Sequence, residues 1–402
     1  MNVAGIIVEY NPLHRGHVHL MEEIRRKLGP ETAIVCCMSG DFVQRGDFAL
    51  LRRQARAKAT VESGADLVLE LPVSFAAASA ERFAMGGVET LLASGVVTHL
   101  AFGSECGDGD ALLRLADALE SEAFSSALKE ELRLGDSFPA ARQRAAARLL
   151  SAEEAALLSS PNNTLGIEYC KALRRAGSSI GILTIPRLGA DHGSLELSGV
   201  TSSASAIRAA LRRGEREEAL QAMAPAMAKV YLEEEAAGRA PVFYDRSERA
   251  ILGRLRTMTR ADFAALDEGK EGLYNRLYEA SRTAASLEEV LDRAKTKRYP
   301  HARLRRMVLW AYLGLQPGAF PKAPAYLRPL AANETGRALL GRMRKTAALP
   351  ILTKSGDVRR LSKEAQRLFE QEAAAADLYT LGYPELSAAA GGSLWREGPV
   401  LL

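Results

Sequence analysis

The chain has 402 residues, of which 47% are apolar and 25% are charged. This composition is typical of a globular protein and excludes a disordered, collagen-like or fibrous one, and the length predicts two or three domains. No stretch approaches the roughly 18 consecutive apolar residues of a membrane helix.

The N-terminal segment MNVAGIIVEYNP has no basic region ahead of its apolar run and no small-residue cleavage site. It therefore indicates a first strand and not a signal peptide, and we expect a cytoplasmic protein. The four cysteines, Cys36, Cys37, Cys106 and Cys170, show no CxxC spacing and no His–Cys ligand pattern. Neither a disulfide scaffold nor a structural metal site is expected, and adjacent Cys36 and Cys37 are predicted core residues.

The formal net charge of +4 conceals an uneven distribution of charge along the chain. Residues 1–200 hold 20 Lys and Arg against 25 Asp and Glu, a balance of −5, whereas residues 201–402 hold 33 against 24, a balance of +9. A basic half joined to a mildly acidic half fits a protein in which one part carries out chemistry and the other binds a polyanion such as nucleic acid. Random drift of surface charge explains the split equally well at this point.

Short apolar runs alternate with helical patterns through the first half of the chain. Near-continuous apolar strands separated by helices are typical of a parallel sheet that is covered on both faces. The sequence therefore predicts a Rossmann-like, doubly wound α/β domain, in which ligands bind outside the carboxyl ends of the strands. Strands are expected at residues 4–10, 32–39, 66–72, 98–104 and 180–186, with helices between them at 18–28, 51–64 and 81–95.

Helical patterns replace the strand signal between about residues 105 and 178, which predicts a helical insertion before the last strand. Beyond this strand the chain is rich in Ala, Leu, Arg and Glu, as are helices with exposed charged faces. Only residues 351–361 suggest a hairpin, with a turn at Ser355-Gly356-Asp357. We place a boundary near residue 215, between an α/β domain (1–215) and a mainly helical domain (216–402).

The first predicted strand leads through a turn into His14-Arg15-Gly16-His17, which opens a helix. Gly16 lets the main chain approach a ligand closely, and the first turn of a helix offers unpaired N–H groups to an anion. Both histidines can face one phosphate and stabilise charge that develops on an α-phosphate and on departing pyrophosphate. Histidines at a helix start are otherwise caps or packing groups, but with His19 this segment holds three of the six histidines of the chain.

A hydroxyl-rich segment, TSSASAIR from Thr201 to Arg208, follows the last predicted strand. Ser203 and Ser205 fit an ordinary helix N-cap, which needs no further function. In this position the hydroxyls and the guanidinium of Arg208 also come close to the far phosphates of a nucleotide that the histidines hold.

These two segments resemble the signature motifs of the HIGH-motif nucleotidyltransferase superfamily. The resemblance narrows when further segments are taken in their order along the chain. GIIVEYNPLHRGHVHL, MSGDFVQRGDFA, ADLVLELP, FGSE, SPNNTLGIEYCKAL and KTKRYPHARLRR are together similar to the tRNA(Met) cytidine acetate ligase family.

The resemblance implies a two-step enzyme. ATP and acetate would form acetyl-adenylate and pyrophosphate, and the acetyl group would pass to N4 of the wobble cytidine of elongator methionine tRNA. His14 and His17 would stabilise the transition state, and Mg²⁺ is expected on the ATP phosphates without a ligand cluster from the protein. The implied ATP site consists of Ile7, Val8, Glu9, Tyr10, Asn11, Pro12, Leu13, His14, Arg15, Gly16, His17, Val18, His19, Leu20, Gly103, Asn162 or Asn163, Arg187, Ser203, Ser205 and Arg208.

Four of these positions can also be read from their places at strand and helix ends. Gly103 ends a strand where a side chain would block a nucleotide, although a plain turn glycine fits as well. Asn162 and Asn163 precede a helix, where they contact a nucleotide or act as caps. Arg187 ends the last strand, where it meets a phosphate or a surface carboxylate.

Two further segments are assigned to substrates. The loop at residues 38–49 follows the second strand, and we expect Asp41, Gln44 and Arg45 near the substrates; a solvated turn is the alternative. Residues 293–306 contain seven basic residues and no acidic one, which fits phosphate contacts with an interleaved aromatic for base stacking, or a solvated charged face. The tRNA contacts expected there are Lys295, Lys297, Arg298, Tyr299, Arg303 and Arg306.

Two other functions remain open at this stage. A small-molecule adenylyltransferase that makes a dinucleotide cofactor accounts for the histidine motif equally well, but it leaves the basic half without a role. A non-catalytic RNA-binding protein with a relict nucleotide domain predicts damaged motifs, whereas both histidines and Arg208 are present.

Overall fold

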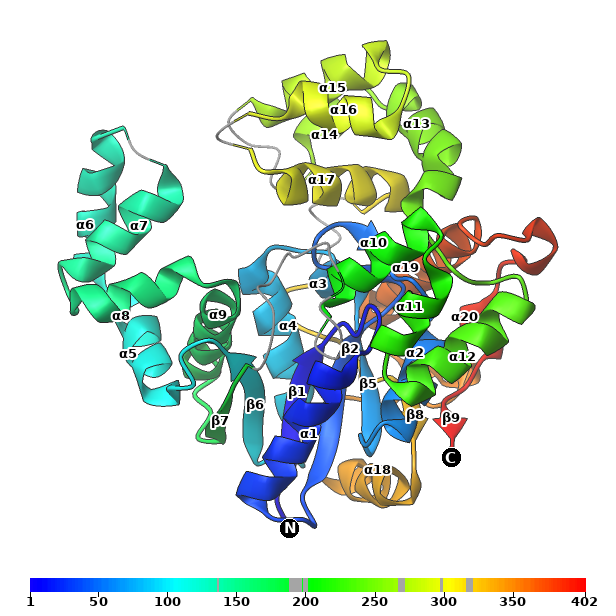
Figure 1. Ribbon diagram of the computed structural model, residues 1–402, viewed down its shortest axis with the longest axis horizontal. Helices are drawn as coiled ribbons and strands as arrows, with labels where there is room; N and C mark the ends of the chain where they lie inside the picture. The colour runs from blue at the N-terminus through cyan, green and yellow to red at the C-terminus, as the bar shows by residue number, and fades with distance from the viewer. Residues whose placement is uncertain (136, 188–196, 198–201, 267–271, 297–298, 316–320) are drawn as a thin grey trace.

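The structure is a computed structural model that describes residues 1–135, 137–187, 197, 202–266, 272–296, 299–315 and 321–402. Its centre is a seven-stranded sheet with the strand order β7-β6-β1-β2-β5-β8-β9 (Figure 1). The strands of this sheet are β1 Val3–Val8, β2 Ala33–Ser39, β5 Leu67–Leu71, β6 His99–Ser104, β7 Gly181–Pro186, β8 Pro329–Ala332 and β9 Val400–Leu401. The five strands predicted in the first half are confirmed, and they pair in parallel.

The helices lie on both faces of this sheet and in two lobes beside it. None of those in the described ranges is long and apolar enough to span a membrane. In chain order they are α1 Arg15–Leu28, α2 Arg53–Glu62, α3 Val73–Ala76, α4 Ala80–Ala93, α5 Gly109–Leu119, α6 Glu122–Arg133, α7 Phe138–Ala147, α8 Ala152–Ala156, α9 Pro161–Arg175, α10 Ala204–Arg213, α11 Arg216–Ala222, α12 Pro225–Ala236, α13 Glu248–Thr257, α14 Arg260–Ala264, α15 Leu273–Thr283, α16 Leu287–Ala294, α17 His301–Leu313, α18 Glu334–Thr346, α19 Lys363–Thr380 and α20 Ser393–Arg396.

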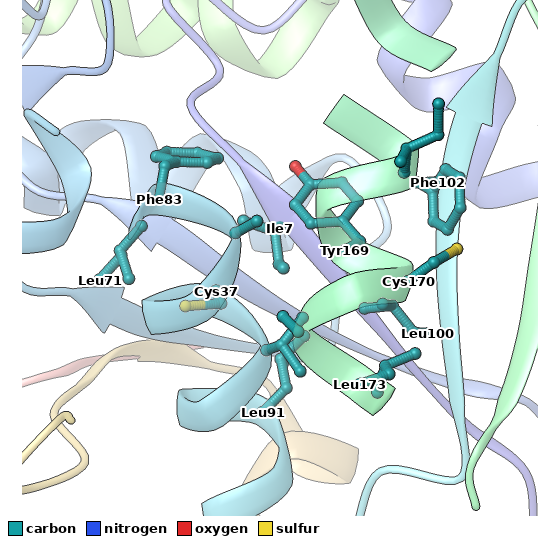
Figure 2. Packing of buried hydrophobic residues seen from close by; sticks show 14 of the residues in the cluster. Ile7, Cys37, Leu71, Phe83, Leu91, Leu100, Phe102, Tyr169, Cys170 and Leu173 are labelled. Atoms are coloured by element: carbon teal, nitrogen blue, oxygen red, sulfur yellow. The ribbon is translucent and has the colours of Figure 1, made fainter. Parts of the chain in front are cut away.

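Alternate side chains of β1 and β2 enter two different cores. Ile7 and Cys37 face the core covered by α4 and α9, where Figure 2 shows them on the same side as Tyr169. Ile6 and Cys36 face the core covered by α1 and α2. Because every residue of these two strands is buried, the sequence reads as a continuous apolar run. Burial also raises the pKa of the Cys36 thiol to about 12, as expected for a core cysteine.

The predicted helical insertion is confirmed. Helices α5 to α8 form a lobe that extends away from the sheet, at the left of Figure 1. Helix α9 then returns to pack against α4 and β6, and β7 follows it at the edge of the sheet. The insertion therefore leaves the order of the parallel strands intact.

The second half is mainly helical, as predicted, but it also adds two strands to the sheet. Strand β8 pairs antiparallel with β5, and β9 pairs parallel with β8. At four and two residues they are too short to give a strand signal in the sequence. The predicted hairpin at 351–361 is wrong: Ser355–Arg360 form a 3₁₀ helix, because Val358 packs into a small core with Leu352 and Phe369.

Buried charges fasten this second half to the sheet. The carboxylate of Glu70, at the end of β5, accepts hydrogen bonds from Arg53 of α2 and from Arg328 next to β8. Glu372 of α19 accepts the N–H of Val73 at 2.6 Å, and burial raises the pKa of its carboxyl group. Because an unpaired buried charge is costly, each half depends on the charges that the other supplies.

A second set of helices, α13 to α17, forms the lobe at the top of Figure 1 around its own hydrophobic core. The small hairpin of β3 (Phe42–Val43) and β4 (Asp47–Phe48) reaches this core from the first half, and Phe42 and Phe48 belong to it. Gly46 in the turn has a φ of 73°, and an added Cβ would lie 2.4 Å from the main-chain N of Arg306. The hairpin and α17 are therefore in direct main-chain contact.

Two glycines of α18 test how tightly the second half packs on the first. A Cβ on Gly336 would lie 1.9 Å from the main-chain oxygen of Asp66, whereas a Cβ on Gly341 meets nothing within 4 Å. We expect Gly336→Ala to lower the free energy of unfolding by about 1–3 kcal/mol through overpacking. Gly341→Ala should leave it unchanged or raise it by up to ~1 kcal/mol, since Ala is the better helix former. Urea denaturation of both variants checks this, and equal stabilities would contradict the packing described.

Candidate nucleotide-binding site

The two histidines of the predicted motif stack at the start of α1. His14 is the N-cap residue, and its Nδ1 accepts the N–H of Gly16 at 3.2 Å, while Nδ1 of His17 accepts the N–H of His14 at 3.2 Å. The ring centroids are 3.7 Å apart with an interplanar angle of 30°. Because each Nδ1 is an acceptor, the neutral rings carry their protons on Nε2 and are hydrogen-bond donors there. A stacked pair of donors at a helix N-terminus is suited to an anion.

The chain between β1 and α1 is tightly constrained. Tyr10 is buried and has a φ of 46°, a left-handed conformation that is unusual for a bulky residue, and its ring lies 4.7 Å from that of His17. Gly16 allows the ring of His14 to fold back, since a Cβ there would lie 3.1 Å from Cε1 of His14. Strain of this kind persists only where surrounding contacts hold it.

Arg56 supplies these contacts. This fully buried residue of α2 donates to the main-chain oxygens of Glu9 and Gly40, to Ser39 at 2.9 Å and to Leu51 at 3.0 Å. Its guanidinium thereby ties the carboxyl end of β1 to that of β2. The sequence reasoning missed Arg56, because an arginine in a helical pattern is usually a surface residue.

The second predicted motif meets the first. Arg208 of α10 donates to the main-chain oxygen of Asn11 at 2.9 Å and lies 3.9 Å from the carboxylate of Asp47. Ser203 is the N-cap of α10 and accepts the N–H of Ala206 at 3.1 Å, and Ser205 is half-buried in the first turn. Thr201 lies outside the described residues. Arg208 therefore lies beside the turn that precedes the two histidines, and its contact with nucleotide phosphates stays a prediction.

The predicted residues on β6, at the start of α9 and directly after β7 form a single cluster around Glu105. Its carboxylate accepts the side-chain and main-chain N–H groups of Asn162, at 2.6 and 3.1 Å, and the N–H of Asn163 at 2.7 Å. Burial opposes this ionised form, but the hydrogen bonds prevail and lower the pKa of Glu105. A Cβ on Gly103 would lie 3.3 Å from Cγ of Arg187, which places those two residues side by side. Glu105 lies two residues after Gly103 in the FGSE segment, but only the glycine was predicted to belong to the site.

The two asparagines differ in their availability to a ligand. Asn163 is buried, and its Oδ1 accepts the N–H groups of Glu105 at 2.9 Å and Cys106 at 3.2 Å. The side chain of Asn162 faces Arg187, with 3.4 Å between Oδ1 and Nη1. Asn163 therefore holds the loop after β6 in place, whereas Asn162 is half-buried between Glu105 and Arg187.

The loop at residues 38–49 does not present all three of its predicted residues. Asp41 is buried in an ion pair with Arg53. Its carboxylate also accepts hydrogen bonds from the main-chain N–H of Arg53 at 2.8 Å and from Nε–H at 2.9 Å. Gln44 donates its main-chain N–H to Glu9 at 2.6 Å. Burial raises the pKa of the Glu9 carboxyl group. The hydrogen bond from Gln44 and the positive charges of Arg208, Arg56 and Arg45 lower this pKa but do not cancel the effect of burial. Of the three predicted residues, exposed Arg45 is the one whose side-chain charge acts on Glu9 and Arg208.

The basic segment is divided between surface and core. Lys295 is exposed, but Tyr299 is buried and lies under the guanidinium of Arg303, 5.4 Å from its ring centroid. Tyr299 therefore does not offer a ring face to a base, contrary to the expectation of stacking. Arg306 is half-buried on α17, and Lys297 and Arg298 lie outside the described residues. Within the described ranges no group of three His, Cys, Asp or Glu side chains could hold a metal ion.

A phosphate-binding helix start at the carboxyl edge of a doubly wound sheet is shared by the nucleotidyltransferase class of α/β proteins. The model of the family described as HIGH Nucleotidyl Transferase matches residues 1–392. The tRNA(Met) cytidine acetate ligase of Acetivibrio thermocellus is 37% identical over 416 residues, which cover 100% of this chain and 100% of that protein. The tRNA(Met) cytidine acetate ligase of Caldanaerobacter subterraneus is 38% identical over 390 residues, which cover 95% of this chain and 96% of that protein.

Solved structures agree with these relatives. Thermotoga maritima TmcAL without ligand has a TM-score of 0.96, and the same protein with alpha-thio ATP has 0.92, each at 33% identity with both chains covered completely. The chain therefore belongs to the HIGH nucleotidyltransferase family and, within it, to the tRNA(Met) cytidine acetate ligase family.

The asparagine pair yields a direct test. Asn163→Ala removes the acceptor of two main-chain N–H groups, so we expect a loss of about 1–3 kcal/mol in the free energy of unfolding. Asn162→Ala should change stability by no more than ~0.5 kcal/mol and should instead weaken ATP binding severalfold. Thermal denaturation and calorimetric titration with ATP separate the two effects, and the assignment is wrong if the variants exchange these phenotypes.

Proposed function

We propose that this protein is an ATP-dependent tRNA-modifying ligase that acetylates N4 of the wobble cytidine of elongator methionine tRNA. The observation that carries the proposal is the intact histidine pair at the start of α1, with Arg208 beside it, in a chain that its relatives match from end to end. The relatives are named for tRNA(Met), cytidine and acetate, and the protein would act in the cytoplasm, where these substrates meet.

In the first step a carboxylate oxygen of acetate attacks the α-phosphorus of ATP. The bond to pyrophosphate breaks, and acetyl-adenylate and pyrophosphate are formed. Charge accumulates on the phosphate oxygens, and Nε2–H of His14 and of His17 would donate to them, joined by the N–H groups at the start of α1. Arg208, with the hydroxyls of Ser203 and Ser205, would hold the departing phosphates.

In the second step N4 of the cytidine attacks the carbonyl carbon of the adenylate. AMP leaves with the electron pair of the broken C–O bond, and N4 loses a proton. Neither step needs a nucleophile from the protein, so the task of the chain is to align the reacting atoms. Mg²⁺ would arrive bound to the ATP phosphates and neutralise part of their charge, because the described residues offer no carboxylate cluster to hold it.

The predicted division near residue 215 describes how the work would be shared. Residues 1–215 would bind ATP, with Asn162 and Arg187 at the far end of the site from Arg208. Residues 216–402 would bind tRNA, with Lys295, Arg303 and Arg306 close to the RNA phosphates. Since β8 and β9 complete the sheet, this division does not imply two units that fold separately.

The activity is tested by incubating the protein with ATP, labelled acetate and elongator methionine tRNA, followed by digestion of the RNA to nucleosides. Labelled N4-acetylcytidine is the expected product, and it should be absent when ATP is omitted. Unlabelled RNA, with pyrophosphate released only when a small-molecule acceptor is supplied, would establish the adenylyltransferase alternative instead.

A pair of variants separates the two steps. His17→Ala should slow acetate-dependent exchange of pyrophosphate into ATP by about 10²–10³-fold, the usual effect of losing one donor to a developing charge, while tRNA binding stays intact. The double charge reversal Lys295→Glu with Arg303→Glu should weaken tRNA binding and preserve the exchange. Filter binding of tRNA and the exchange assay measure both properties, and parallel loss of the two in either variant would contradict the assigned division.

A further inference from the structure

An apolar hollow lies between the β3–β4 hairpin and the helical lobe. The side chains at its base are Phe48, Ile251, Leu287, Leu291, Val308 and Leu309, all of them buried. Gly46, Tyr244 and Arg305 also line the hollow, and these three are half-buried, so they form its rim. The space that the hollow encloses together with its open mouth is about 310 Å³.

The rim combines an aromatic ring with cations. The guanidinium of Arg305 lies 5.9 Å from the ring centroid of Tyr244, and that of Arg212 lies 5.3 Å from it. The Nε atom of Arg305 is buried and has no hydrogen-bond partner within the described part of the chain. A buried donor left unpaired is costly, which favours a ligand that accepts from it.

This rim continues into the nucleotide site. Arg212 lies one turn after Arg208 on α10, and Arg208 contacts Asn11 in the turn before the histidines. Asp47, whose carboxylate lies 3.9 Å from Arg208, is the first residue of β4 and directly follows Gly46 in the chain. Arg208 and Arg212 of α10 therefore connect the turn before the histidines with Tyr244.

We propose that Tyr244 and Arg305 form a subsite for an unpaired nucleobase of the RNA acceptor, next to the cytidine that reacts. The proposal rests on the proposed function, which supplies the RNA. A nucleobase would stack on the ring of Tyr244 at the apolar rim, and a phosphate oxygen would accept a hydrogen bond from Arg305. These are the two contacts by which proteins hold single-stranded RNA. Since Tyr299 is buried, Tyr244 takes the stacking role that the sequence suggested for Tyr299.

RNA fits this rim better than the adenine of ATP does. Asn162 lies in the first turn of α9 and Arg187 directly follows β7, the edge strand beyond β6, whereas Arg208 of α10 contacts the turn after β1. A nucleotide that spans from His14 toward the Asn162–Arg187 pair would extend toward β7 and leave the rim at Tyr244 open to the RNA. Exposed Arg45 and Arg305, whose Nε is unpaired within the described residues, supply positive charge for the phosphates of an RNA strand, whereas Arg212 is already paired with Asp245 at 2.7 Å.

The test compares the KM for elongator methionine tRNA in acetylation, at saturating ATP and acetate, with acetate-dependent pyrophosphate exchange in the absence of RNA. Tyr244→Leu keeps the apolar packing but removes the stacking face, so the KM for tRNA should rise about tenfold. Tyr244→Phe keeps the face and should remain within about twofold of the unmodified protein. Arg305→Gln should raise this KM and reduce the slope of log KM against log salt by about one phosphate contact.

Arg260→Ala is the matched control. The guanidinium of Arg260 also lies over a tyrosine, 4.4 Å from the ring centroid of Tyr278, but it is already bonded to Asn275 and Glu279. The KM for tRNA of this variant should not change.

An equal KM in Tyr244→Leu and the unmodified protein overturns the subsite and leaves the proposed function standing. A loss of exchange in Tyr244→Leu, with normal melting and no change in the KM for tRNA, would mean that ATP occupies the rim, which also overturns it. Absence of N4-acetylcytidine with the unmodified protein overturns the proposed function itself.

Discussion

The guanidinium of Arg56 is the interaction on which the geometry of the site depends. A buried positive charge is tolerated only when its donors are satisfied, and here they bond to main-chain oxygens of four residues at the ends of two neighbouring strands and in the loop before α2. The same bonds fix the direction in which the chain leaves β1. The left-handed Tyr10 and the cap of α1 follow within a few residues, so the stacked histidines take their positions from a fully buried side chain of another helix.

Buried charge also explains why the two halves form one structure. Arg53 is neutralised by Asp41 in the loop after β2 and by Glu70 at the end of β5, and Glu70 in turn neutralises Arg328 from the second half. Removing one partner leaves another charge unpaired in the interior, which is far more costly than losing a surface ion pair. The basic excess of the second half is therefore partly structural, and only its exposed members remain for a polyanion.

The sequence predicted what local patterns determine. Continuous apolar runs gave the five parallel strands, and the histidine motif gave the start of α1, because burial on both faces and helix capping leave a signal in neighbouring residues. Asp41 and Tyr299 were assigned to substrates, and Asn163 was one of two candidates, but the structure places Asp41 in an ion pair, Asn163 in a loop anchor and Tyr299 in a core. Their partners are distant in the chain, and one sequence does not show which polar group will be enclosed. Strand β8 was not predicted for a similar reason, because it forms a strand through its pairing with β5 and not through its own composition.

The β3–β4 hairpin joins the two surfaces that a two-step reaction requires. Its turn makes both contacts: Gln44 donates its main-chain N–H to Glu9, and Gly46 touches the main chain of α17. No larger residue could occupy that turn without separating the hairpin from the helix, since the nearest atoms belong to the main chain and cannot rotate away. The hairpin therefore connects α17, through main-chain packing at Gly46, with Asp47, whose carboxylate lies 3.9 Å from Arg208. The positions of the helical lobe and of Arg208 are set by the same short segment, which is why neither half of the chain can be described without the other.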